Sequence, residues 1–88
     1  MKTIMFDERC AGWSKNVEWN KMFLHIQKEY LNERLRSKGY MYLNGIYESL
    51  GASWDPDEEN ICYRARDGLL NIEFEPVGDN AFLVKIYH

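Results

Sequence analysis

GYMYLNGIYESLG, residues 39–51, is the stretch that decides the fold, because it ends one helix, provides a short extended link and begins a second helix. Gly39 follows a basic turn and can take a positive φ, which is typical of a helix end. Asn44 is predicted to cap the second helix by accepting hydrogen bonds from its first amides. Gly51 is expected to end that helix. The stretch carries no nucleophile, metal-ligand set or phosphate-binding loop, so it predicts architecture and not activity.

A long helix is predicted before this stretch, at Val17–Lys38, after a loop in which Ser14 and Asn16 are candidate caps. At about 100° per residue this helix carries two apolar stripes. The aromatic stripe contains Trp19, Met22, Phe23, Ile26 and Tyr30, and the leucine stripe contains Leu24, Leu31 and Leu35. We expect the aromatic stripe to face a sheet and the leucine stripe to face the second helix. The alternative is that the leucine stripe forms the contact of a homodimer.

The clearest strand pattern is a hairpin in the second half of the chain. Residues 61–66 and 69–75 are strand-forming segments that flank Asp67-Gly68, a dipeptide typical of a two-residue type I′ turn. Pairing across this turn would place Tyr63 opposite Ile72 and make one face of the hairpin wholly apolar.

Two further strands complete the predicted sheet. Lys2–Phe6 is short, apolar and suited to pairing with a sheet edge. A five-residue loop, 76–80, leads to a last strand in which Phe82 is predicted to lie beside Phe74. The long helix can cover the apolar face of this sheet. The sequence therefore predicts one two-layer α+β domain, residues 1–88, with one long and one short helix on a three- to four-stranded antiparallel sheet in the order β-α-α-β-β-β.

Composition narrows the classes of function. The chain has 88 residues, of which 45% are hydrophobic, enough for one core without disulfides. A formal charge of -3 and a pI of about 5.3 argue against a general nucleic-acid binder. No run approaches the ~20 apolar residues of a membrane span, and the charges at Asp7-Glu8-Arg9 come too early for a secretory segment. We therefore expect a cytoplasmic protein in which Cys10 and Cys62 are reduced.

One segment carries a resemblance to known sequences, namely Gly39-Tyr40-x-x-Leu43-Asn44-x-x-Tyr47-x-x-Leu50-Gly51. With an amphipathic helix before it and a short sheet after it, it resembles an uncharacterised family of proteins from phages and mobile elements of Gram-positive bacteria, which carry a similar G-Y-x-F-L-N-x-V-Y-x-x-L-G segment. The resemblance covers roughly the middle third to half of the chain and departs from the family pattern at Met41-Tyr42 and Gly45-Ile46. It implies a genomic setting and a shared scaffold, with no catalytic residue to carry over.

Residue types that bind metals or act as nucleophiles are sparse. Cys10, Cys62, His25 and His88 lack the spacing of a metal-binding motif, and neither cysteine has a histidine near it in the sequence. No cofactor and no metal are therefore expected.

The acidic loop after the second helix is the candidate partner-binding site. It contains Trp54, Asp55, Asp57, Glu58 and Glu59. A proline interrupts it, and it lacks the Asp-x-Asp-x-Asp-Gly spacing of a calcium loop. Tryptophan is enriched among interface anchors, and the carboxylates can engage a basic partner. The alternative is that Trp54 packs beneath the sheet as a core residue.

These patterns predict a small, non-enzymatic protein-binding module of phage or mobile-element origin. Its partner is expected to be a host or phage protein, with inhibition of a host defence or nucleic-acid enzyme as one mode of action; neither nucleic acid nor a membrane is expected. The alternative is an enzyme, because the element order also resembles that of RelE-like toxins, which cleave messenger RNA on the ribosome. That resemblance implies roles for Arg64, Arg66, Lys85, Tyr87 and His88. The acidic pI weighs against it.

Overall fold

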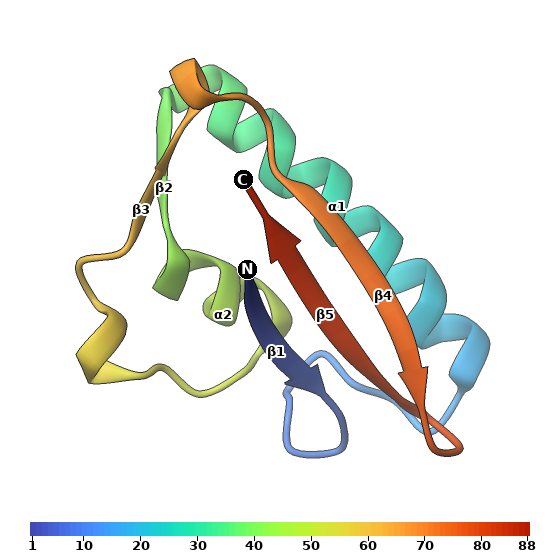
Figure 1. The fold of residues 1–88 in the computed structure, drawn as a ribbon. Helices are drawn as coiled ribbons and strands as arrows, with labels where there is room; N and C mark the ends of the chain where they lie inside the picture. The colour runs from blue at the N-terminus through green and yellow to red at the C-terminus, as the bar shows by residue number, and fades with distance from the viewer.

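The computed structural model describes residues 1–88 and shows the long helix lying along one face of an antiparallel sheet (Figure 1). In chain order the elements are β1 (Lys2–Phe6), α1 (Val17–Lys38), β2 (Tyr40–Tyr42), α2 (Leu43–Leu50), β3 (Cys62–Arg64), β4 (Asn71–Val77) and β5 (Ala81–Tyr87). Single 3₁₀ turns occupy Pro56–Glu58 and Ala65–Asp67. The predicted α+β class, with a long and a short helix against an antiparallel sheet, is confirmed, and the predicted extended link between the helices is the strand β2.

The main sheet has three antiparallel strands in the order β1-β5-β4, so β5 is central. The predicted first strand is confirmed, and it pairs with β5 along its whole length. The predicted pairing of the last two strands is also confirmed, but its register is wrong by two residues, because Phe82 lies opposite Pro76 and not beside Phe74. The cause is a three-residue turn, 78–80, in place of the predicted five-residue loop. A shift of two keeps each side chain on its predicted face.

The predicted hairpin at Asp67-Gly68 is wrong. β3 pairs with β2 in a separate two-stranded sheet, so Tyr63 lies opposite Met41 and not opposite Ile72. A type I′ turn needs a positive φ at both central residues, and here only the glycine has one. The aspartate instead ends a 3₁₀ turn.

Two contacts hold the chain in this alternative path. The amide of Ala65 donates to the carbonyl of Gly39 at 2.9 Å, which extends the pairing of β3 with β2. The side-chain amide of Asn32 then binds both polar groups of the Leu70 backbone, accepting from its N–H at 2.8 Å and donating to its carbonyl at 2.9 Å. Because Asn32 lies on α1, it fixes the start of β4 against the helix.

Both ends of α1 are as predicted. The side-chain oxygen of Asn16 caps the first turn by accepting hydrogen bonds from the amides of Glu18 and Trp19. At the other end Gly39 has a φ of 86° and donates its N–H to the carbonyl of Leu35.

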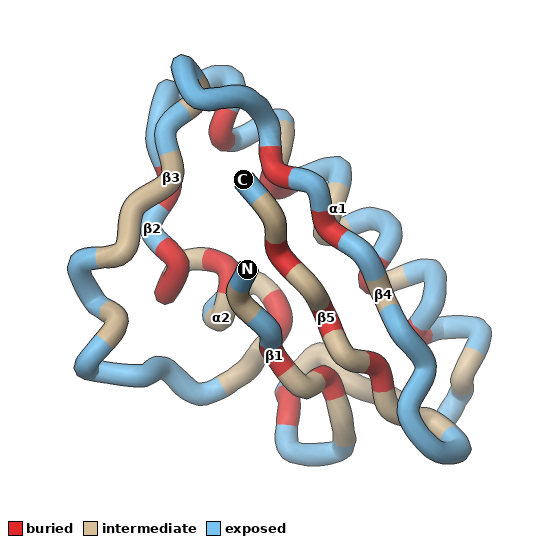
Figure 2. Tube along the Cα trace, viewed as in Figure 1, coloured by how far each residue is buried: buried red, intermediate tan, exposed pale blue.

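The assignment of the aromatic stripe of α1 to the sheet is wrong, whereas the leucine stripe packs with α2 as predicted. The leucine stripe lies in the core that the sheet and α2 share, which excludes it as an oligomer contact. The aromatic stripe faces outward, apart from Phe23, which stacks on Phe6 of β1 at 5.6 Å. Its other members, each 45–53% exposed, are Trp19, Met22, Ile26 and Tyr30. Figure 2 shows both buried and exposed stretches along α1. Because the sheet and α2 lie on the same side of α1, one face of the helix covers both (Figure 1).

The start of α2 also differs from the prediction. Its capping position is Tyr42, which makes no side-chain hydrogen bond to the helix, and the predicted cap Asn44 is buried within the first turn. The predicted end is confirmed, because Gly51 has a φ of 72°. A Cβ at Gly51 would lie 2.6 Å from the amide nitrogen of Ala11, so only glycine fits between α2 and the loop after β1.

The loop between β1 and α1 is fastened to the turn between β4 and β5. Trp13 donates its indole N–H to the carbonyl of Asn80 at 2.7 Å. The buried Asn20 of α1 donates to the Asn80 side chain at 2.8 Å and to the Ser14 carbonyl at 2.7 Å. In the same loop Cys10 is a buried free thiol.

Candidate functional site

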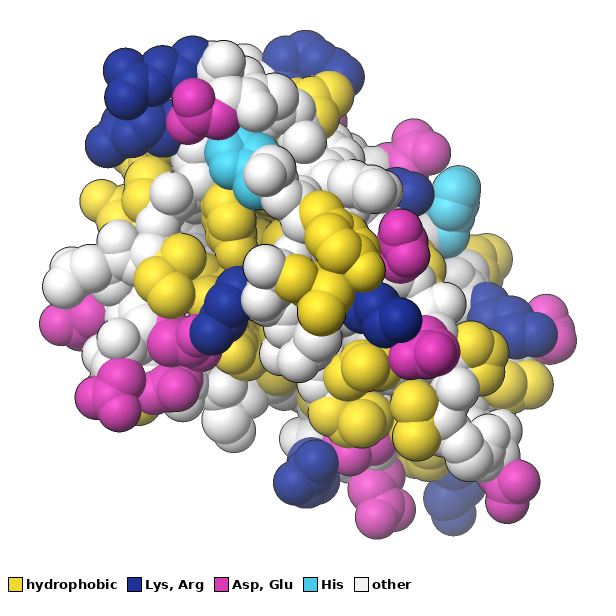
Figure 3. Space-filling view, in the orientation of Figure 1, with side chains coloured by type: hydrophobic (Ala, Val, Ile, Leu, Met, Phe, Trp, Pro, Cys, Tyr) yellow, Lys and Arg dark blue, Asp and Glu magenta, His cyan; other side chains and the backbone are white.

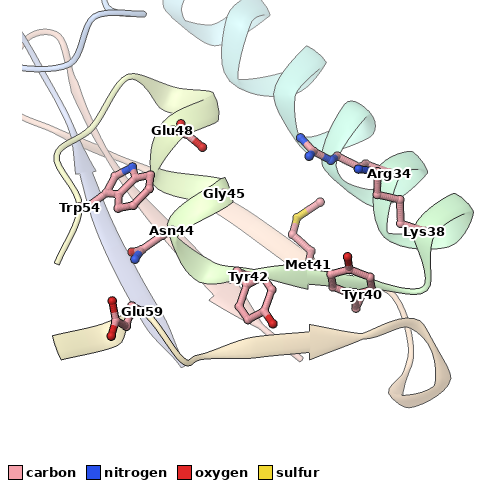
Figure 4. A pocket seen from close by; sticks show the side chains of 10 residues that line it. All are labelled: Arg34, Lys38, Tyr40, Met41, Tyr42, Asn44, Gly45, Glu48, Trp54 and Glu59. Carbon is pink, nitrogen blue, oxygen red and sulfur yellow. The ribbon is translucent and has the colours of Figure 1, made fainter. Parts of the chain in front are cut away.

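A pocket of about 360 Å³ opens where the end of α1, β2, α2 and the loop after α2 meet (Figure 4). Ligand sites in proteins typically measure about 300–1,000 Å³, so this volume suits a side chain or a small ligand. The lining combines three aromatic rings with charges of both signs. It also joins the segment 39–51 to the acidic loop, two features that the sequence singled out separately.

Strand β2 places two tyrosines at the pocket. Side chains alternate along a strand, so Met41 turns into the core while Tyr40 and Tyr42 face outward. The two tyrosine rings meet edge to face with their centroids 5.9 Å apart, and they are 47% and 49% exposed. The core therefore does not account for either ring.

The acidic loop brings Trp54 and Glu59 to the same pocket. Trp54 is 57% exposed, so the alternative in which it packs beneath the sheet is wrong. Figure 4 shows its indole and the Glu59 carboxylate on the same side of the pocket as Asn44. Partner binding by these residues stays a prediction.

The other three residues predicted for partner binding lie outside the pocket lining. Asp55 caps the 3₁₀ turn by accepting from the amide of Asp57 at 2.9 Å, and both residues are exposed. Glu58 turns inward, where it accepts a hydrogen bond from the Tyr47 hydroxyl at 2.9 Å and forms an ion pair with Lys2. These contacts tie the loop to α2 and to β1.

The Tyr47 hydroxyl is suited to hold Glu58 in place. Burial raises the pKa of Tyr47, and the nearby Asp55 carboxylate raises it further. The hydroxyl therefore keeps its proton at neutral pH and remains a donor to the carboxylate.

Asn44 is the buried polar residue of the pocket wall, with 6% of its surface exposed. Its Oδ1 atom has no hydrogen-bond partner. A buried acceptor without a partner destabilises a fold by about 1–3 kcal/mol, and native proteins contain few of them. Oδ1 of Asn44 therefore gives the fold no hydrogen bond that would explain an amide at this position of α2.

Charge divides the pocket into two sides. Arg34 and Lys38 lie on one side, and Glu59 lies on the other with Trp54 (Figure 4). Neither the two cations nor the lining carboxylates Glu48 and Glu59 belong to an ion pair. Figure 3 shows the same division on a larger scale, with carboxylates over the loop between α2 and β3 and cationic groups at the end of the molecule where α1 meets β2.

The residues that the toxin alternative requires do not line a common pocket, and none of the five lines any pocket of the structure. Arg64 and Arg66 are exposed at and after the end of β3. Lys85 lies on the main sheet, where its ammonium is 3.2 Å from the Glu75 carboxylate. The hydrogen bond to Glu75 raises the pKa of Lys85.

Several lining residues were not predicted as site residues. The sequence predicts only a link at Tyr40 and Tyr42, although the alternation Tyr-Met-Tyr is itself a strand signal with two outward rings. At Asn44 it predicts a helix cap. At Arg34 and Lys38 it predicts a helix end, and only the fold brings these cations to the acidic loop.

A scan against protein-family models, a search of curated proteins and a search of solved structures each found no significant match. No helix combines the length and the apolar character needed to cross a membrane. No three His, Cys, Asp or Glu side chains lie close enough together to hold a metal ion.

Proposed function

We propose that the chain is a protein-binding module and that its contact surface is centred on this pocket. The proposal is supported chiefly by one observation: three exposed aromatic rings, Trp54, Tyr40 and Tyr42, converge on one pocket from two separate segments. Tryptophan and tyrosine are common interface anchors, because they offer a large contact area at a small cost in conformational entropy. Unpaired charges of both signs around the rings favour selectivity between partners.

The proposed partner is a host or phage protein in the bacterial cytoplasm, and inhibition of a host defence or nucleic-acid enzyme is one form that binding can take. This part of the proposal rests on the resemblance of residues 39–51 to proteins of phages and mobile elements. The exposed carboxylates Asp55 and Asp57 extend the acidic side of the surface beyond the pocket. They favour a partner with basic groups at its rim.

Capture from a bacterial lysate tests the proposal, with the wild-type chain, Trp54→Ala and Trp19→Ala immobilised in parallel. Trp19 is the matched control, because it is a similarly exposed tryptophan on the outer face of α1. We expect a protein that the wild-type and Trp19→Ala chains retain and that Trp54→Ala loses. With that partner purified, Trp54→Ala should weaken binding about 30-fold, or about 2 kcal/mol, while the melting temperature stays nearly unchanged.

Three results would contradict the proposal. The first is the absence of a specific partner in lysates made with and without phage infection. The second is loss of the partner with Trp19→Ala but not with Trp54→Ala, which would move the interface to α1. The third is growth arrest on expression that Arg64→Ala or Arg66→Ala abolishes, which would favour the toxin alternative.

A further inference from the structure

Asn44 indicates what the pocket lacks. The residue is buried, its Oδ1 has no partner, and its amide end lies on the Trp54 side of the pocket (Figure 4). Oδ1 is an acceptor, so the missing partner is an N–H or O–H donor. Oδ1 is shielded from solvent in this conformation, so the amide has to turn toward the pocket before a ligand can donate to it, and that turn breaks no hydrogen bond of Oδ1.

The surroundings of Asn44 favour a donor with positive charge. Glu59 lies on the same side of the pocket, and Glu48 follows Asn44 by one turn of α2; neither carboxylate has an ion-pair partner. The rings of Trp54 and Tyr42 are exposed at the rim. Aromatic faces attract cations, most strongly the face of tryptophan.

We infer that this side of the pocket binds an arginine side chain of the partner protein, an inference that rests on the proposed function and names the group that is bound. A guanidinium is planar and carries five N–H donors, so its face can stack on an aromatic ring while its edge donates to a carboxylate and to Asn44. A lysine ammonium supplies the charge but has no flat face to stack. On the opposite side, Arg34 and Lys38 are free to pair with a carboxylate of the same partner segment.

Titration of the isotope-labelled chain with Nα-acetyl-arginine amide, followed by nuclear magnetic resonance, tests the inference. We expect shifts of the Asn44 side-chain amide and of the Trp54 indole N–H, with a dissociation constant on the order of millimolar for so small a probe. Nα-acetyl-citrulline amide has the same shape without the charge, and it should bind at least about tenfold more weakly. Nα-acetyl-lysine amide should lie between the two.

Three variants sharpen the test. Asn44→Leu removes the unpartnered amide, so it should raise the melting temperature and abolish arginine binding. Glu59→Gln changes an exposed side chain and should weaken arginine binding by about three- to tenfold without affecting folding. Glu73→Gln is the matched control, since Glu73 is an exposed carboxylate of β4 outside the pocket, and it should change neither property.

Equal affinity for the arginine and citrulline compounds would overturn the inference, as would shifts confined to residues outside the pocket. An Asn44→Leu variant that melts at a lower temperature and still binds arginine would show that the amide serves the fold alone. If Asn44→Leu does not fold, unchanged affinity in Glu59→Gln would be enough to reject the inference. The two proposals can fail separately. If the capture experiment finds a partner that Trp54→Ala loses, but the arginine compound does not bind, the proposed function stands and only this inference is rejected.

Discussion

The three-stranded sheet and the two-stranded sheet use their large side chains in opposite ways. Along β5 every second residue is buried, so the core accounts for the inward-facing apolar side chains of the central strand. In the two-stranded sheet Met41 is buried, while Tyr40 and Tyr42 on either side of it stay about half exposed. The main sheet therefore stabilises the fold, whereas the small sheet displays aromatic groups that the fold does not use.

The largest effect is expected from Phe6→Ala in the main sheet. Phe6 is fully buried and stacks on Phe23, so its truncation removes a large apolar side chain and leaves a cavity. We expect the free energy of unfolding, measured with urea, to fall by about 4 kcal/mol. Val77→Ala, at an exposed position of β4, is the control and should cost less than about 0.5 kcal/mol. A loss below about 1 kcal/mol for Phe6→Ala would place the core elsewhere.

Two variants of β2 test the same contrast within the small sheet. Met41→Ala should lower the free energy of unfolding by about 2 kcal/mol, because Met41 is the buried residue of this strand. Tyr42→Ala should cost less than about 1 kcal/mol, because half of its side chain already contacts water. Chemical denaturation of both variants measures the difference. Equal losses would show that the outward ring supports the fold, and the contrast between the two sheets would then be wrong.

A smaller effect is expected from Tyr47→Phe, which removes the hydrogen bond to Glu58 and so loosens the loop beside the small sheet. We expect a loss of about 1 kcal/mol in the free energy of unfolding. Tyr30→Phe is the control, because the Tyr30 ring is half exposed on α1, and it should be neutral. Thermal melts give the stability, and the line width of the Trp54 indole resonance reports the mobility of the loop. A rigid loop in Tyr47→Phe would mean that the ion pair of Glu58 with Lys2 suffices.

The smallest effect is a dependence of the free energy of unfolding on pH, which comes from the buried thiol of Cys10. Burial raises the pKa of the Cys10 thiol, so the folded chain keeps a proton that the unfolded chain releases above the ordinary thiol pKa of about 8.5. This contribution to stability is fully present below that pH and is lost as pH rises toward the raised pKa. Urea titrations between about pH 7.5 and 9.5 should therefore show that the free energy of unfolding falls more steeply with pH for the wild type than for Cys10→Ala. Parallel declines would rule out Cys10 as the source.

Signals that depend on a few neighbouring residues predicted the structure well. The cap at Asn16 and the helix ends at Gly39 and Gly51 each follow from one side chain or one positive φ, and all three are confirmed. Which strands pair could not be predicted in the same way. Asp67-Gly68 is a strong hairpin signal, but contacts between distant residues, such as Asn32 with Leu70, direct the chain away from a hairpin.

The orientation of α1 and most of the pocket also depend on contacts between distant residues. Periodicity revealed both stripes of the helix, but which of them is buried follows from the position of α2 relative to the sheet. The composition of the acidic loop was enough to name Trp54 and Glu59 as candidate binding residues, and both line the pocket. Asn44 could not be recognised from the sequence, because an asparagine near a helix start predicts a cap, and only the fold shows its amide buried and unpaired.

The central position of β5 has a consequence for biosynthesis. On the ribosome the amino-terminal residues emerge first, so β1 and β4 are both made before β5, which is the only strand that pairs with either of them in the main sheet. Until Ala81–Tyr87 is synthesised, both strands have unpaired edges and the nascent chain cannot close its main sheet. A chain stalled before Ala81 can form its helices in part but not this sheet. The main sheet of this protein therefore forms only after translation of its final strand.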